Sequence, residues 1–178
     1  MFQPDATSEM MKGERCTLEF IRDYTMYAAI LGFFSLSWFG WAQEKPRESW
    51  RKYLGMASGV SLLVCLIGVY LSVNSWNAPS ALSDASTFHT YVITVYIEFF
   101  LAGAGAIVLL LRKRGNYVAP WIAFIVGIHF VGLAPVFHDN GLYILAALIV
   151  AISIASLFIS RTLNVANSAI TGIGTGCS

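Results

Sequence analysis

The segment TYVITVYIEFFLAGAGAIVLLL, from Thr90 to Leu111, decides the fold of this chain. It contains one acidic side chain, Glu98, and no basic one. About 20 mostly apolar residues are enough for a helix to cross a bilayer, so the segment predicts a transmembrane helix. A carboxylate at that depth costs about 2.5–3.5 kcal/mol on insertion scales. We therefore expect Glu98 to face a polar partner or a cavity rather than lipid.

Four further stretches have a similar length and apolar character. The chain is 57% hydrophobic and 12% charged, whereas a soluble domain carries roughly 25% charged residues. Lipid offers no hydrogen bonds to the backbone, which favours helices. We predict an all-α integral membrane bundle of five transmembrane helices, at 24–43, 53–73, 90–111, 118–137 and 141–160. The domain organisation is a tail at 1–23, a transmembrane domain at 24–161, and a flexible, Gly- and Ser-rich tail at 162–178.

Lys and Arg are concentrated in alternate connections. Residues 44–52 contain four of them and 112–114 three, and Arg161 closes the fifth span, whereas 74–89 and 138–140 contain none. Cytoplasmic loops are the ones enriched in Lys and Arg. This pattern predicts an N-terminus outside and a C-terminus inside, although three basic residues in the N-terminal tail run against it.

Two further features concern packing. Gly55 and Gly59 form a small-xxx-small pair, which predicts a close helix–helix contact on the second span. Trp38 and Trp41 lie at the inner end of the first span. Because indole rings favour the membrane–water interface, both are predicted to be interfacial anchors.

His129 is a second ionisable group at membrane depth. Glu98 and His129 each lie eight residues from the outer end of their span, about 12 Å deep at 1.5 Å per residue. Residues 112–117 join these spans, which makes the two helices antiparallel neighbours. We therefore predict that Glu98 and His129 meet, directly or through one water. Tyr91 and Thr94 share the face of Glu98 at helical spacing, and complete a candidate buried polar site.

The pair supports two hypotheses of function. The sequence favours a structural or accessory membrane protein in which the pair fixes the register of two helices. The alternative is a small proton- or cation-coupled transporter, or a small-molecule-binding membrane protein, that uses Glu98 and His129. The expected partners are the lipid bilayer and a small molecule or ion. A net charge of +1 gives no sign of a nucleic-acid partner.

Metal-ligating side chains also occur in the two connections predicted to lie outside, at Asp84, His89, His138 and Asp139. They are weak candidates for Zn or Cu, because their spacing matches no established motif. The sequence contains no HExxH, GxSxG or P-loop motif, so no enzyme activity is predicted. Haem between helices would need axial ligands on opposite sides, and the sequence has only one histidine at membrane depth. No cofactor is therefore predicted.

The run VGIHFVGLAPVF, Val126–Phe137, resembles the VGxHFxxLAxxF motif of a family of small bacterial multi-pass membrane proteins that have no assigned activity. The run that contains Glu98, YIEF, is similar to what precedes the motif in that family. The resemblance implies the same helical fold and a bacterial plasma (inner) membrane location. It marks as motif positions Gly127, His129, Phe130, Leu133, Ala134 and Phe137.

Overall fold

Each long apolar stretch forms a helix in the computed structural model, which describes residues 21–44, 46–78, 85–137 and 139–178. Within these residues, five helices are long and apolar enough to cross a membrane. They are α2 (Ile21–Ala42), α3 (Arg51–Asn74), α4 (Ala85–Leu111), α5 (Val118–Phe137) and α6 (Gly141–Leu163), followed by the shorter α7 (Asn167–Cys177). The predicted all-α fold with five spans is confirmed. Of the predicted tail at 1–23, residues 1–20 lie outside the described residues, and residues 21–23 begin α2.

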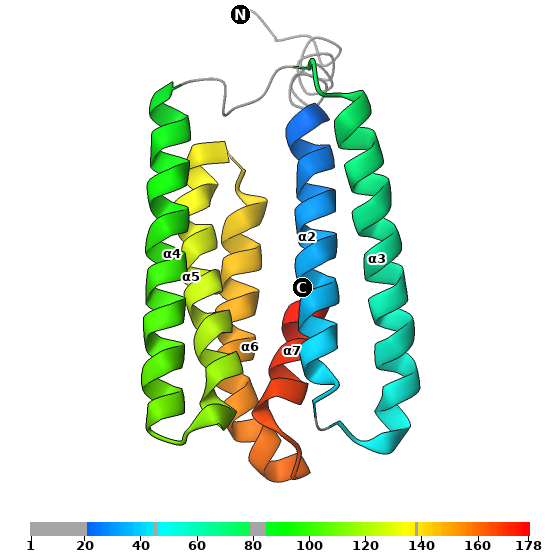
Figure 1. The fold of residues 1–178 in the computed structure, drawn as a ribbon, viewed down its shortest axis with the longest axis vertical. Helices are drawn as coiled ribbons and strands as arrows, with labels where there is room; N and C mark the ends of the chain where they lie inside the picture. The colour runs from blue at the N-terminus through cyan, green and yellow to red at the C-terminus, as the bar shows by residue number, and fades with distance from the viewer. Residues whose placement is uncertain (1–20, 45, 79–84, 138) are drawn as a thin grey trace, which may run out of the picture.

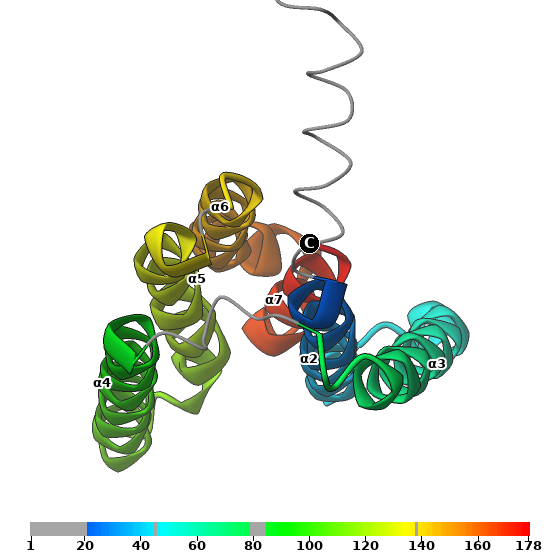
Figure 2. The same ribbon diagram turned by 90° about the horizontal axis from the view of Figure 1, so that it is seen from above.

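The helices form two groups (Figures 1 and 2). In one group α2 packs against α3; in the other, α5 packs against both α4 and α6. Helix α7 lies between the groups and packs on α2, α5 and α6. Short 3-10 turns, η1 (Glu48–Trp50) and η3 (Gly115–Tyr117), lead into α3 and α5. α3 and α4 therefore stand apart, on opposite sides of the molecule (Figure 2).

The close contact between α2 and α3 is made by Gly32 and Gly68. A Cβ atom added to Gly32 would lie 2.7 Å from the backbone nitrogen of Cys65, and one added to Gly68 would overlap the backbone of Ala29. Because these positions have no side chains, the two backbones can approach closely. Dispersion contacts then stabilise the helix pair, since lipid provides no hydrophobic driving force for helix association. This contact joins the two helices near the middle of α2.

The predicted contact at Gly55 and Gly59 was wrong. Apart from chain neighbours and the adjacent backbone of α3 itself, no described atom lies within 4 Å of a Cβ added to either glycine. The buried positions of α3 are Leu54, Ser61, Gly68 and Ser72, which define a different face of the helix. Gly55 follows Leu54 by one residue, and one residue turns the side-chain direction by about 100°.

The prediction of a flexible tail at 162–178 was also wrong for its greater part. α6 continues to Leu163, Asn164 adopts a left-handed conformation with φ 53° and ψ 43°, and the chain turns into α7. A Cβ on Gly172 would lie 2.5 Å from the carbonyl oxygen of Trp38, so α7 packs directly on the backbone of α2. Thr171 is fully buried. The small residues that suggested flexibility are those that permit close helix packing.

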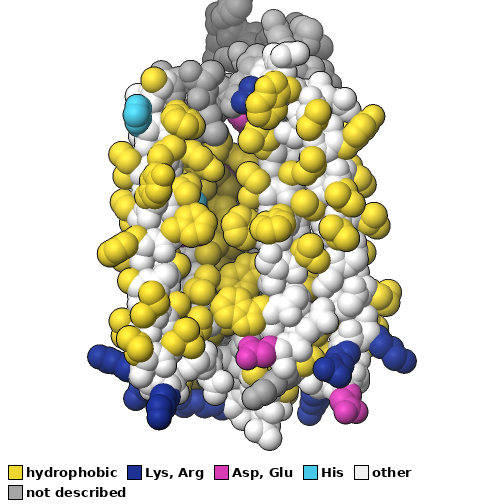
Figure 3. Space-filling model, viewed as in Figure 1, with side chains coloured by type: hydrophobic (Ala, Val, Ile, Leu, Met, Phe, Trp, Pro, Cys, Tyr) yellow, Lys and Arg dark blue, Asp and Glu magenta, His cyan; other side chains and the backbone are white. Residues whose placement is uncertain are grey.

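Basic side chains gather at one end of the molecule (Figure 3). This end holds the α2–α3 and α4–α5 connections and the end of α6, and its described Lys and Arg residues are Arg47, Arg51, Lys52, Arg112, Lys113, Arg114 and Arg161. Arg22 lies at the opposite end, where it joins α2 to the end of α3. Its Nη1 donates to the carbonyl of Trp76 at 3.1 Å, and its guanidinium lies 4.8 Å from the centre of that ring.

Candidate functional site

Glu98 of α4 and His129 of α5 are in contact inside the membrane-spanning region. Nε2 of His129 lies 3.4 Å from Oε2 of Glu98, and the two side chains are 8% and 14% exposed, respectively. Packing of α4 on α5 brings the two residues to the same level. The contact predicted from their equal depth and from the short α4–α5 connection is present.

The second ring nitrogen of His129 is also buried. Nδ1 makes no hydrogen bond of normal geometry to any described residue, although the backbone of Thr94 lies near the ring. A neutral imidazole has one donor and one acceptor nitrogen. The pair can therefore make hydrogen bonds beyond its own contact. Nδ1 of His129 and the second carboxyl oxygen of Glu98 are the atoms that could make them.

The other two residues of the predicted site lie differently. Tyr91 faces the same cavity as Glu98, and its ring centre is 6.1 Å from that of Phe137. The Thr94 hydroxyl donates to the carbonyl of Thr90 in its own helix at 2.8 Å. Thr94 does not line the cavity. Of the predicted polar face, Tyr91 and Glu98 are thus available to a ligand, and Thr94 is not.

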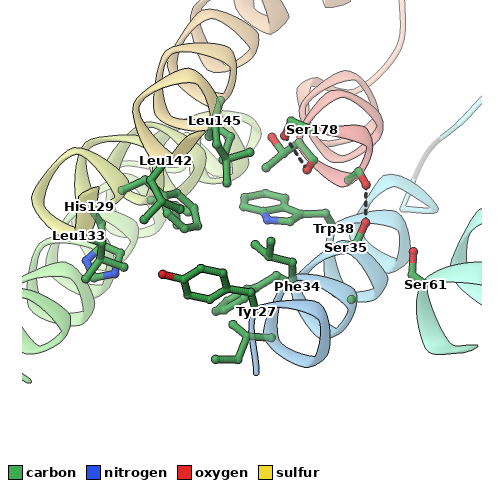
Figure 4. A pocket seen from close by; sticks show the side chains of 18 of the residues that line it. Tyr27, Phe34, Ser35, Trp38, Ser61, His129, Leu133, Leu142, Leu145 and Ser178 are labelled. Carbon is green, nitrogen blue, oxygen red and sulfur yellow. Dashed lines mark hydrogen bonds between the residues drawn. The ribbon is translucent and has the colours of Figure 1, made fainter. Parts of the chain in front are cut away.

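Glu98 and His129 form part of the wall of a groove with a volume of about 650 Å³. All six helices α2–α7 contribute to its lining. Figure 3 shows the groove as the hollow between α4 and α2, and Figure 4 shows its interior. Most of its lining is apolar or aromatic, with these side chains among the largest: Tyr27, Phe34, Trp38, Phe130, Leu133 and Leu145.

Sequence reasoning missed the wall of the groove that α2 provides. Tyr27, Phe34 and Trp38 are separated by seven and four residues, which places them on one helical face. Tyr27 projects across the groove toward α5 (Figure 4), where its ring centre lies 5.1 Å from that of Phe137. This spacing was visible in the sequence, but an aromatic stripe equally describes a lipid-facing surface.

Trp38 is not the interfacial anchor that its position predicted. Only 5% of Trp38 is exposed, and it packs with Ala123 of α5 and Ile149 of α6. Trp41 stacks on Trp38, with ring centres 5.6 Å apart. The indole of Trp38 thus connects α2 to the other helix group and forms part of the groove lining.

The motif positions of α5 divide between two surfaces. Phe130, Leu133 and Phe137 line the groove beside His129. Gly127 faces α6, where an added Cβ would lie 2.7 Å from Cγ2 of Val150. Ala134 is buried in a cluster with Leu133 and Leu142. The VGxHFxxLAxxF pattern therefore combines a face that contacts the groove with a face that packs on α6.

The weak metal candidates do not form a site within the described chain. Asp139 Oδ1 accepts a hydrogen bond from the backbone N–H of Gly141 at 2.8 Å, at the start of α6. His89 is on α4, with its ring next to Phe88. Asp84 and His138 lie outside the described residues. Among residues that the structure describes, no three His, Cys, Asp or Glu side chains are placed to share a metal ion.

Comparisons of the chain with known protein families, with curated proteins and with solved structures gave no match. The class of protein therefore rests on its fold and composition. Five apolar helices of membrane-spanning length define a multi-pass membrane protein whose outer surfaces contact the lipid bilayer.

Proposed function

We propose that this protein binds a lipid-soluble small molecule in the groove, with Glu98 and His129 as the polar contact. The observation that carries the proposal is the position of this ionisable pair in the wall of a groove of about 650 Å³. Ligand sites typically measure about 300–1,000 Å³ and combine an apolar lining with a few polar groups. Ionisable residues at membrane depth typically mark substrate or ion pathways.

The arrangement of the helices supports entry of the ligand from the bilayer. α3 and α4 stand apart, and the groove is hollowed into the face of the molecule between α4 and α2 (Figure 3). That face carries apolar side chains along the spanning helices. A molecule dissolved in lipid can reach this groove without crossing water. Its apolar body would contact rings such as Phe130, and its head would exchange hydrogen bonds with Glu98 and His129.

The surroundings of the pair favour ligand binding over a purely structural role. A buried pair that only fixes the register of two helices requires no cavity beside it. Glu98 and His129 instead both line the groove. Residues from α2, including Tyr27, face them across it (Figure 4).

A stabilisation screen with lipid-soluble compounds tests this proposal. When a compound binds only the folded state of the purified protein, a free concentration of 100 times its Kd stabilises that state by about 2.7 kcal/mol. We expect the shift in thermal midpoint to shrink in Glu98→Gln, which replaces the ionisable carboxyl group by an amide of similar shape. Thr94→Val is the matched control, because Thr94 lies one helical turn away and does not line the groove. Equal shifts in the two variants, or no stabilising compound in a broad set, would contradict the proposal.

We further propose that the basic end of the molecule faces the cytoplasm and that the membrane is the bacterial plasma membrane. The support is the Lys and Arg residues gathered at that end, together with the resemblance carried by Val126–Phe137. In a background with Cys16, Cys65 and Cys177 replaced, cysteines at Ser80 and Asn140 should react with an impermeant thiol reagent in intact cells. A cysteine at Gly115 should react only after lysis. Labelling at Gly115 in intact cells would reverse the orientation.

A further inference from the structure

A second, polar cleft of about 240 Å³ lies at the basic end of the molecule. It is formed where α6 ends, α7 begins and η3 leads into α5. Its lining contains no carboxylate and consists of Asn116, Tyr117, Ser160, Arg161, Asn164, Val165, Ala166 and Asn167. Arg161 therefore gives the lining a net positive charge.

The turn between α6 and α7 builds this cleft. The left-handed conformation of Asn164 ends α6, and the backbone N–H groups of Asn164 and Val165 both donate to the carbonyl of Ser160. The Ser160 hydroxyl donates to the amide oxygen of Asn167. Because its amide oxygen accepts this bond, the Asn167 side chain has its two amide N–H groups left as hydrogen-bond donors. The turn thus places the side chains of Asn164 and Asn167 in the lining of the cleft.

The start of α7 adds further donors. Its N-cap residue, Ala166, has no side chain that accepts a hydrogen bond. The N–H group of Ala169 donates to the carbonyl of Ala166 at 3.0 Å. The N–H groups at the start of a helix carry a partial positive charge. Arg161, the amides of the asparagines and these N–H groups therefore favour a ligand with several anionic oxygens.

From this combination we propose that the cleft binds a phosphate group, supplied by an anionic phospholipid headgroup or by free phosphate. Arg161 is in the last turn of α6 and Tyr117 directly precedes α5, so the cleft lies at the end of the spanning region where headgroups are found. Basic pockets between transmembrane helices bind lipid headgroups in this setting. The site is separate from the groove, and its occupancy does not depend on Glu98 or His129.

Thermal unfolding of the full chain in a zwitterionic detergent tests this site with three probes. These are short-chain phosphatidylglycerol, phosphatidylcholine of the same chain length, and inorganic phosphate. We expect phosphatidylglycerol to raise the midpoint, and Arg161→Gln to weaken this binding about tenfold or more, because a charge-assisted contact is lost. Arg112→Gln is the matched control, since Arg112 is an exposed cation at the same end that does not line the cleft.

The outcomes separate the two sources of phosphate. A shift with phosphatidylglycerol alone that depends on Arg161 identifies a lipid headgroup, and the same dependence with inorganic phosphate identifies a soluble ligand. If Arg161→Gln does not fold, Asn164→Gly replaces it, because glycine keeps the left-handed turn and removes the amide. The proposal would be overturned if ligand binding weakens equally in the cleft variant and in Arg112→Gln. It would also be overturned if binding does not weaken in the cleft variant.

Discussion

Replacement of Gly68 by alanine is expected to lower the free energy of unfolding by about 2–3 kcal/mol. The added Cβ would lie 2.8 Å from the carbonyl carbon of Ala28 and from Cα of Ala29. Both are backbone atoms, so no side chain can rotate to make room and the helices α2 and α3 have to separate. Equilibrium unfolding in mixed detergent micelles measures the loss.

Gly59→Ala is the matched control for this variant. Gly59 is on the same helix, and its replacement by alanine adds the same methyl group. A Cβ there has no described atom within 4 Å other than the adjacent backbone of α3. We expect a change within about 0.5 kcal/mol, as for substitutions away from packed contacts. A loss at Gly59 that matches the loss at Gly68 would show that α3 does not pack through the face that contains Gly68.

A double-mutant cycle on Glu98 and His129 is expected to show strong coupling. Glu98→Leu leaves His129 buried beside an apolar side chain, and His129→Leu does the same to Glu98. Each orphaned partner should lower the free energy of unfolding by about 1–3 kcal/mol. The double variant should lose less than the sum of the two, by about 0.5–3 kcal/mol, because no buried polar group remains without its partner. The same unfolding assay provides all four values.

The control for this cycle combines Glu98→Leu with Ser61→Ala. Ser61 lies across the groove on α3, where its hydroxyl donates to the carbonyl of Ala57 in its own helix. The two effects should therefore add within about 0.5 kcal/mol. Additivity in the Glu98–His129 cycle, to the same tolerance, would mean that the 3.4 Å contact carries no coupling energy.

Sequence reasoning was sufficient where a single physical quantity decides the structure. The length of each apolar stretch was enough to predict the five spans, because the thickness of the bilayer sets the length that a spanning helix must have. Equal depth and a short connection were enough to bring Glu98 next to His129, because consecutive helices joined by six residues are antiparallel neighbours. Both inferences depend on distance along the chain and need no knowledge of which helix face packs.

The errors arose where the facing direction of a helix decides the structure. In a membrane, lipid-facing and protein-facing surfaces are both apolar, so hydropathy does not distinguish the face with Gly68 from the face with Gly59. The same ambiguity hid the contribution of Tyr27 and Trp38 to the groove. In residues 167–177, low hydropathy and many small residues predict a flexible tail, whereas the structure has a helix, α7, held by backbone contact with α2.

The division of the helices into two groups bears on how the width of the groove could change. Within each group, helices pack along much of their length; between the groups, the packing is through α7 and through aromatic side chains such as Trp38 and Tyr27. Rigid groups linked by a small interface move relative to one another by sliding or hinging, with little repacking inside either one. An interface of this kind would let the width of the groove change through a shift of the 11-residue helix α7. If the groove binds a ligand as proposed, such a shift would fit the groove to ligands of different width, while Glu98 and His129 stay in contact on α4 and α5.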